Sequence, residues 1–208
     1  MSAVDGFLAH LAECPLVAII RGVRPEEAEA VGGALIEAGI RIVEVPLTSP
    51  EPLHSIGILA RRFGDVATIG AGTVLDPADV RRIADVGGRI IVSPNAHAGV
   101  ISATVAAGIA AAPGIFTPSE AFAALDAGAH ALKLFPAEAA SPAVLKAMKA
   151  VLPSKVPVLV VGGIAPDSMH PWRDAGAAGF GLGSALYKPG QTAETVGESA
   201  RRFIAALR

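Results

Sequence analysis

The sequence predicts an α/β protein, a single (β/α)8 TIM barrel that occupies residues 1–208. An apolar run followed by a helical pattern recurs at intervals of about twenty to twenty-five residues, which is typical of a βα repeat. The runs are hydrophobic nearly throughout, as in parallel strands covered by helices. Eight such units close most naturally into a barrel, and an open doubly wound sheet is the alternative.

The first unit begins with the apolar run Leu16–Ile20, which we expect to be a strand. The segment Arg24-Pro25-Glu26-Glu27 follows, with proline and acidic residues where a first helical turn favours them. This helix is expected to end at Gly39, because glycine readily adopts the left-handed conformation of a helix cap. The next strand is predicted at residues 41–46.

The same signals for helix starts and helix ends recur along the chain. Helix starts are indicated by a cap residue or proline at Asp76-Pro77, Thr117-Pro118 with Glu120, Ser141-Pro142 and Ala165-Pro166. Glycine caps are predicted at Gly39, Gly64, Gly87, Gly108, Gly128 and Gly176, with Pro153 in the place of one more. The eight predicted strands are 16–20, 41–46, 67–71, 89–93, 109–112, 130–135, 157–161 and 178–182.

The composition excludes several classes of function. Hydrophobic residues make up 52% of the chain and aromatic residues 4%, which predicts a large aliphatic core and is consistent with an oligomer. A net charge of -2 without a basic run argues against nucleic acid as a partner. The single Cys14 and the lack of Cys/His clusters predict a cytoplasmic protein with no structural metal. No apolar run approaches the roughly 18 residues of a membrane span, so no membrane partner is expected.

Lys133 lies within Ala131-Leu132-Lys133-Leu134-Phe135, an otherwise apolar run that predicts a core strand. An ammonium group is costly in such a setting, so the lysine pairs with a carboxylate, reaches water, or loses its proton. The chain has twelve arginines and only five lysines, and Lys133 is the first lysine. A neutral amine would be a nucleophile, whereas a structural lysine at a strand end is the alternative.

Strand alternation predicts which side chains point into the barrel. If the valines of Val43-Glu44-Val45 face the helices, Glu44 points inward, and the same parity turns Lys133 inward between Leu132 and Leu134. Arg21 ends the first predicted strand. Because reactive groups of βα barrels gather at the carboxyl ends of the strands, we expect Arg21, Glu44 and Lys133 to share one mouth.

This combination of residues predicts Schiff-base chemistry. A neutral lysine can add to a ketone, and the protonated Schiff base then stabilises a carbanion on the neighbouring carbon. An ordinary lysine pKa of about 10.4 leaves almost no neutral amine at pH 7, so burial and a nearby cation such as Arg21 must lower it. Glu44 would move a substrate proton directly or through water. A buried Glu44–Lys133 ion pair that only braces the barrel is the alternative.

Glycine-rich turns at the ends of the seventh and eighth predicted strands form a second candidate site. They are Gly162-Gly163, preceded by Val161, and Gly183-Ser184. Glycine lets backbone N–H groups approach an anion, and barrels often bind phosphate at these two loops, so we expect a phosphate site there. Gly70-Ala71-Gly72-Thr73 and Ser93-Pro94-Asn95 supply further groups at the mouth, although tight turns and helix caps would explain them as well.

The blocks carrying these residues resemble those of the class I aldolases that act on 2-keto-3-deoxy-6-phosphosugar acids, over essentially the whole chain. The matching blocks are Leu16–Gly22, Val43–Leu47, Gly70–Val74, Ser93–Asn95, Ala131–Pro136 and Val161–Gly163. The resemblance implies Lys133 as the Schiff-base residue and Glu44 as the acid/base. It implies Arg21, Thr73 and the Phe135-Pro136 neighbourhood as holders of the keto acid. It further implies a homotrimer without metal or cofactor that yields pyruvate and D-glyceraldehyde 3-phosphate.

Two departures place the chain within this family. Gluconate-type enzymes typically carry Thr-Leu-Arg-Thr after the catalytic glutamate and a threonine before the Gly-Gly pair. This chain has Pro46-Leu47-Thr48-Ser49 and Val161 instead, which resembles the galactonate branch and removes one arginine from the phosphate contacts. A phosphosugar isomerase or epimerase, which has no need of an inward Lys133, and a non-catalytic ligand-binding barrel are the competing hypotheses.

Overall fold

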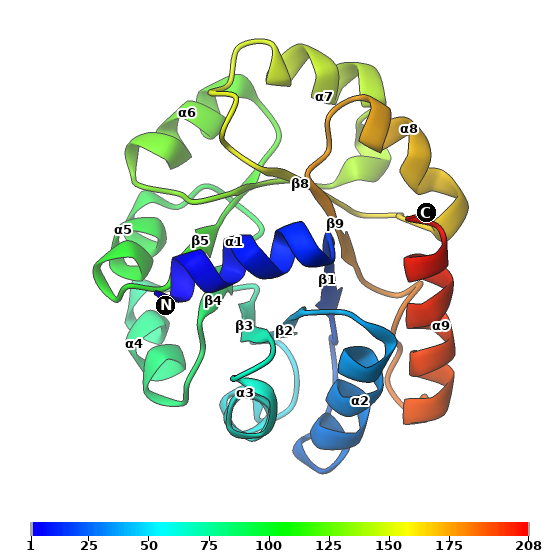
Figure 1. Cartoon of the computed structure of the whole chain (residues 1–208). Helices are drawn as coiled ribbons and strands as arrows, with labels where there is room; N and C mark the ends of the chain where they lie inside the picture. The colour runs from blue at the N-terminus through cyan, green and yellow to red at the C-terminus, as the bar shows by residue number, and fades with distance from the viewer. Residues whose placement is uncertain (1, 208) are drawn as a thin grey trace.

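The computed structural model describes residues 2–207, which form a ring of parallel strands surrounded by helices (Figure 1). The strands are β1 Leu16–Ile19, β2 Ile42–Pro46, β3 Thr68–Gly72, β4 Ile90–Val92, β5 Ala110–Ala112, β6 Gly114–Ile115, β7 Leu132–Leu134, β8 Val158–Val161 and β9 Gly179–Leu182. The helices are α1 Ala3–Glu13, α2 Pro25–Ala38, α3 Pro52–Phe63, α4 Pro77–Asp85, α5 Ala98–Ala106, α6 Pro118–Asp126, α7 Pro142–Lys149, α8 Met169–Asp174 and α9 Ala193–Ala205. Short 3-10 turns η1, Ala137–Ala139, and η2, Pro166–Ser168, follow β7 and β8.

The strand order β5-β4-β3-β2-β1-β9-β8-β7-β6 is parallel throughout, which confirms the predicted TIM barrel and overturns the open-sheet alternative. The fifth strand, predicted at 109–112, is β5, and after Pro113 the chain forms a further strand, β6, that was not predicted. β5 pairs with β4, whereas β6 pairs with β7. The N–H groups of Ala131 and Lys133 donate to the carbonyls of Ala111 and Pro113, at 3.1 and 2.8 Å, and these bonds bridge the interruption.

The predicted helix starts are confirmed, because α2, α4, α6 and α7 and the turn η2 each begin at the expected proline. In α6 the Thr117 hydroxyl accepts from the backbone N–H of Glu120, whose carboxylate accepts from the N–H of Thr117. Five of the predicted glycine caps have positive φ, but Gly64 does not: its φ of -62° is right-handed, so the left-handed cap predicted there is wrong. The α3 helix instead ends with a right-handed turn closed by the Gly64 N–H on the Ala60 carbonyl.

Helix α1 was not predicted, and it closes the amino end of the barrel. Figure 1 shows it lying across the strands, and it packs against β2 to β5. Phe7 and Leu11, one turn apart, are buried with inward residues of the strands such as Val17, Ile42 and Leu159. The amino end of the barrel interior is therefore mainly apolar, apart from buried Thr68 and its hydrogen bond to His10, whereas Glu44 and Lys133 lie nearer the carboxyl end.

Candidate active site

Lys133, the central residue of β7, points into the barrel as the strand alternation predicts. Its neighbours Leu132 and Leu134 join the outer core under the helices, whereas Ala131 and Phe135 join the inner one. The Lys133 side chain is only 7% exposed. Burial lowers its pKa, the Glu44 carboxylate opposes this effect, and the Arg21 guanidinium lowers the pKa further. Its amine lies 4.7 Å from the centre of the Phe135 ring, an apolar surface that limits access of water.

Glu44 of β2 faces the same interior and is 1% exposed. Burial raises the pKa of Glu44 to about 7, against the opposing effects of Lys133 and Arg21. Its Oε2 atom is buried without a hydrogen-bond partner among the described residues. A carboxylate with a pKa near 7 and a free acceptor atom is suited to receive and return a proton at neutral pH.

The Glu44 carboxylate fits the barrel because the neighbouring strand β3 has glycine at two inward positions. Glu44 pairs in register with Gly70, and Pro46 pairs with Gly72. A Cβ atom at Gly72 would overlap the Glu44 carboxylate. The Gly-Ala-Gly sequence therefore makes room for a buried acid, which is a more specific role than the tight turn considered from the sequence.

Arg21 connects the loops after the first three strands. Its guanidinium donates to the hydroxyl of Thr48 at 2.7 Å and to the hydroxyl of Thr73 at 3.3 Å. Thr73 has a φ of 56°, in the left-handed region that β-branched residues avoid. Backbone strain of this kind costs on the order of 1–3 kcal/mol and clusters at functional sites. Here it brings the Thr73 hydroxyl to Arg21 at the edge of the mouth.

A cavity of about 590 Å³ opens at the carboxyl ends of the strands. Ten of the twelve predicted site residues line it: Arg21, Thr73, Pro94, Lys133, Phe135, Val161, Gly162, Gly163, Gly183 and Ser184. Glu44 is buried and does not reach the cavity wall. Asn95 lies outside the lining as an exposed residue, because its backbone packs beside Gly114 and its chain turns away toward α5. The structure thus brings the predicted residues together, with Asn95 as the exception.

Several lining residues were missed from the sequence, among them Glu138, Tyr187, Lys188 and Pro189. Glu138 belongs to η1 after β7, and the other three follow β9. The sequence indicated these residues only by their position after a predicted strand, since any loop that follows a barrel strand can contribute to the mouth. The Glu138 side chain packs over Gly162 and Gly163, whose φ values of 115° and 64° and missing Cβ atoms allow this contact.

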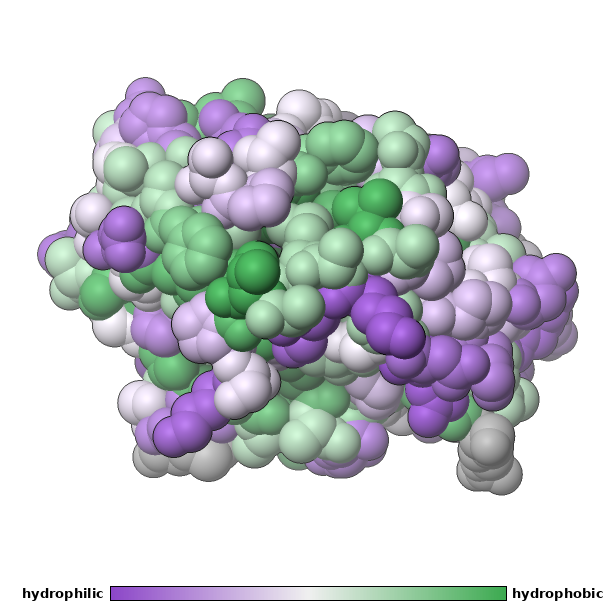
Figure 2. Space-filling model, turned by 90° about the horizontal axis from the view of Figure 1, so that it is seen from above, coloured by the Kyte–Doolittle hydropathy of each residue, from purple (hydrophilic) through white to green (hydrophobic). Residues whose placement is uncertain are grey.

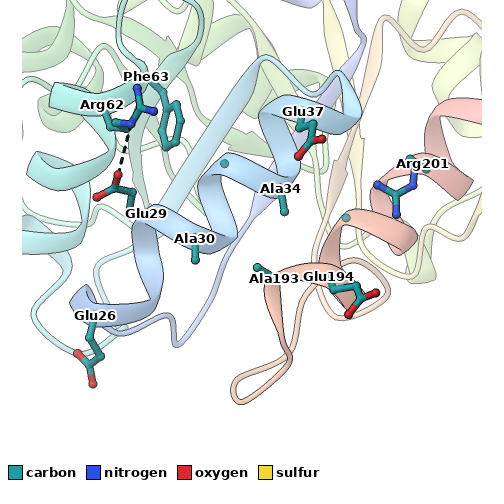
Figure 3. A pocket seen from close by; sticks show the side chains of 12 residues that line it. Glu26, Glu29, Ala30, Ala34, Glu37, Arg62, Phe63, Ala193, Glu194 and Arg201 are labelled. Atoms are coloured by element: carbon teal, nitrogen blue, oxygen red, sulfur yellow. Dashed lines mark ion pairs between the residues drawn. The ribbon is translucent and has the colours of Figure 1, made fainter.

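A larger hollow of about 710 Å³ lies elsewhere, on the outside of the barrel between α2, α3 and α9 (Figure 3). Small residues such as Ala30 and Ala34 line it together with exposed acids, and Glu29 forms an ion pair with Arg62 at 3.3 Å. These charged side chains are all exposed to solvent, where ion pairs contribute little. The mouth cavity, which is smaller, is therefore the candidate active site.

Within residues 2–207 no three His, Cys, Asp or Glu side chains come together closely enough to hold a metal ion. In the same range, no helix combines the length and the apolar character that a membrane span requires.

A (β/α)8 barrel with a buried, inward lysine and a buried glutamate near one mouth defines a barrel enzyme suited to covalent chemistry on a carbonyl group. The family model of KDPG and KHG aldolase matches residues 8–196. The chain belongs to this aldolase family, as the resemblance predicts.

Individual relatives agree with this assignment. The chain is 50% identical to 2-dehydro-3-deoxy-6-phosphogalactonate aldolase of Escherichia coli (strain K12), over 93% of this chain and 95% of the relative. A solved native KDPGal structure superimposes with a TM-score of 0.93 at 49% identity, covering 94% of this chain and 95% of the other. KDPG aldolase from Legionella pneumophila, solved with pyruvate captured as a covalent carbinolamine, gives a TM-score of 0.78 at 27% identity, with 93% and 95% coverage.

Proposed function

We propose that this aldolase cleaves 2-dehydro-3-deoxy-6-phosphogalactonate to pyruvate and D-glyceraldehyde 3-phosphate through a Schiff base on Lys133. The observation that carries the proposal is the burial of Lys133 inside the mouth, with its pKa lowered beside a glutamate whose pKa is raised to about 7. The name of the relative that is 50% identical supports the galactonate substrate. The carbinolamine in the Legionella pneumophila enzyme supports the covalent route.

The reaction begins when the neutral Lys133 amine adds to the C2 ketone, and the carbinolamine takes up one proton from solvent and loses water, which leaves an iminium ion. Glu44 accepts the proton of the C4 hydroxyl directly or through water, and the C3–C4 bond breaks as its electrons move toward the iminium nitrogen. The aldehyde departs and leaves an enamine. Protonation at C3 and hydrolysis of the iminium then release pyruvate and restore the amine.

The remaining mouth residues are assigned to substrate binding. Arg21 and Thr73 hold the keto-acid carboxylate, with Pro94 and Phe135 packing against the pyruvyl part. Gly162, Gly163, Gly183 and Ser184 surround the phosphate, and Val161 faces C4. Ten predicted residues lining one cavity support this division, and no metal or cofactor is needed because the iminium itself withdraws electrons.

Reductive trapping tests the proposal directly. The protein is incubated with pyruvate, reduced with borohydride and analysed by mass spectrometry of the intact chain and its peptides. We expect one reduced pyruvyl adduct, located on Lys133. Absence of an adduct would favour the isomerase, epimerase or ligand-binding alternatives, and an adduct on Lys146, Lys149, Lys155 or Lys188 would overturn the assignment of the nucleophile.

The assembly proposed for the chain is a cytoplasmic homotrimer. Figure 2 looks onto the face where α6 and α7 lie in Figure 1, and a broad apolar area occupies its middle. Phe122 of α6 and Val144 of α7 are 42% and 39% exposed, which is unfavourable for apolar side chains in water. Light scattering coupled to gel filtration should give three times the chain mass, and Phe122→Lys should lower it. A monomeric wild type would contradict the trimer.

A further inference from the structure

The mouth cavity is lined by four charged side chains, and these are distributed unevenly. They are Arg21, Lys133, Glu138 and Lys188. A substrate of the proposed kind carries a carboxylate at one end and a phosphate at the other, so each anion needs compensating charge. The existing hydrogen bonds of each cationic side chain indicate whether it binds the carboxylate or the phosphate of the substrate.

Arg21 and Lys133 are both committed to the keto-acid end. Arg21 is fixed by its hydrogen bonds to Thr48 and Thr73, on the side of the mouth formed by β1 to β3. Lys133 is consumed in the covalent bond to C2. Neither is therefore available to the phosphate, and the chain has leucine, threonine and serine at Leu47-Thr48-Ser49, where gluconate-type relatives supply an arginine.

Lys188 lies in the loop after β9, the strand that pairs with β1, and the next residue, Pro189, lies beside Gly22 in the loop of Arg21. The N–H groups of Leu186 and Tyr187 both donate to the Gly183 carbonyl, at 2.9 and 3.0 Å, which folds this loop into a helical turn. Lys188 follows that turn four residues after Ser184, a spacing that places two side chains on the same side of a turn. Both residues line the cavity.

The backbone of Lys188 is fixed while its amine is free. Its N–H donates to the Gln191 side-chain carbonyl at 2.7 Å. No ion pair within residues 2–207 involves the Lys188 amine, whereas Arg24 at the start of α2 and Arg81 and Arg82 of α4 each have a carboxylate partner. The chain thus presents an exposed, unpaired ammonium group at the edge of an anion-binding cavity.

We infer that Lys188 is the cation that binds the substrate phosphate, in place of the arginine that this chain lacks. The inference rests on the proposed function, and it refines the phosphate site. Glu138, packed over Gly162 and Gly163, places negative charge at the end of β8, beside the strand β9 whose loop carries Lys188. Lys188 therefore supplies the attraction that the phosphate needs beside the Glu138 carboxylate.

Selectivity for the phosphorylated substrate tests this role. The value of kcat/KM is measured for the 6-phosphate and for the same sugar acid without phosphate, in wild type, Lys188→Met, Lys188→Arg and the control Lys155→Met, whose exposed lysine lies before β8 at the amino end. Removing a charge-assisted hydrogen bond should lower the ratio of the two values in Lys188→Met by roughly 10- to 100-fold. Lys188→Arg should restore most of it, and Lys155→Met should match wild type.

Inorganic phosphate provides a second readout. As a competitive inhibitor it should bind more weakly to Lys188→Met than to wild type, and the difference should shrink at high salt because the contact is exposed. An unchanged ratio and unchanged phosphate inhibition in Lys188→Met would overturn the inference. Borohydride trapping with pyruvate separates the two hypotheses: an adduct on Lys133 with an unchanged ratio refutes only the role of Lys188, whereas no adduct in wild type refutes the proposed function itself.

Discussion

The mouth cavity has one lysine deep inside it, Lys133, and one at its solvent edge, Lys188. We call these two positions the floor and the rim, and they are opposite environments. Lys133 is buried inside the barrel beside the Phe135 ring, and burial lowers its pKa. Lys188 is exposed on a loop with no carboxylate partner within residues 2–207. Desolvation favours the neutral amine, which can attack a carbonyl, whereas hydration keeps an ammonium charged and suited to an anion. The same side chain can thus serve as a nucleophile or as a fixed charge, according to its depth in one cavity.

The largest expected effect on activity comes from removing the lysine at the floor, Lys133. We expect Lys133→Ala to abolish turnover and the pyruvate adduct, because Lys133 is the one buried lysine within residues 2–207. The fold should persist, since truncating a costly buried amine does not remove apolar packing as truncating a buried leucine would. Steady-state kinetics and a thermal melt by circular dichroism measure the two effects, with exposed Lys146→Ala as the matched control. Residual adduct formation in Lys133→Ala would show that another lysine reacts.

The second largest effect is expected at Glu44, the buried acid that lies behind the cavity wall and interacts with Lys133 and Arg21. Glu44→Gln should slow turnover by about 10² to 10⁴-fold with little change in substrate binding, because general acid/base catalysis contributes on that order. Since the pKa of Glu44 is raised to about 7 and the carboxylate form accepts the proton, wild-type kcat/KM should fall as pH drops through about 7. The variant should lose this limb of the pH profile. Unchanged turnover would leave Glu44 a structural partner of Lys133 or Arg21.

A smaller effect, on the preference between the two sugar-acid epimers, is expected at Val161, which lies between the floor and the rim. This last residue of β8 packs its methyl groups beside Gly181 and lines the cavity. An apolar wall rejects a polar isostere only weakly, by about 10²-fold at most, so the wild type should prefer the galactonate substrate with appreciable activity on the gluconate epimer. Val161→Thr should shift the kcat/KM ratio toward gluconate. A clear wild-type preference for gluconate would contradict the branch assignment and leave the aldolase assignment intact.

The smallest effect is expected from metal removal. A protonated Schiff base withdraws electrons as a Lewis acid would, so treatment with a chelator should leave the rate unchanged. The assay compares the enzyme before and after dialysis against EDTA. Loss of activity that a divalent ion restores would assign the reaction to a metal-dependent class and would remove the need for Lys133 as a nucleophile.

Much of the fold was predictable because the same residue types mark the start and end of the helices in each βα unit of the barrel. Prolines at helix starts and apolar runs between glycines gave the strands to within a few residues, and alternation gave the inward direction of Glu44 and Lys133. Helix α1 was missed because it precedes the first repeat. Its signal was present in the Ser2 cap, with a hydroxyl that accepts from the Asp5 N–H, and in Phe7 and Leu11 one turn apart.

The site was less predictable at its rim than at its floor. Strand positions alternate strictly, so parity fixes the direction of a side chain, whereas a loop has no period that does the same. Asn95 was predicted to line the mouth, yet its loop turns it to solvent, and Glu138 and Lys188 line the mouth from loops that gave no directional signal. The strain at Thr73 likewise depends on a tertiary contact with Arg21 that no local pattern encodes.

Helix α1 has a consequence for the order of events in the proposed reaction. Because Phe7 and Leu11 close the amino end, the barrel interior has one exit, through the mouth. The aldehyde fragment occupies that exit while the three-carbon fragment is still bonded to Lys133 behind it. The aldehyde therefore leaves first and pyruvate last, and in the synthetic direction pyruvate must enter before the aldehyde. Under the proposed mechanism, the covalent bond at Lys133 and the amino end closed by α1 together would make the order of binding and release compulsory.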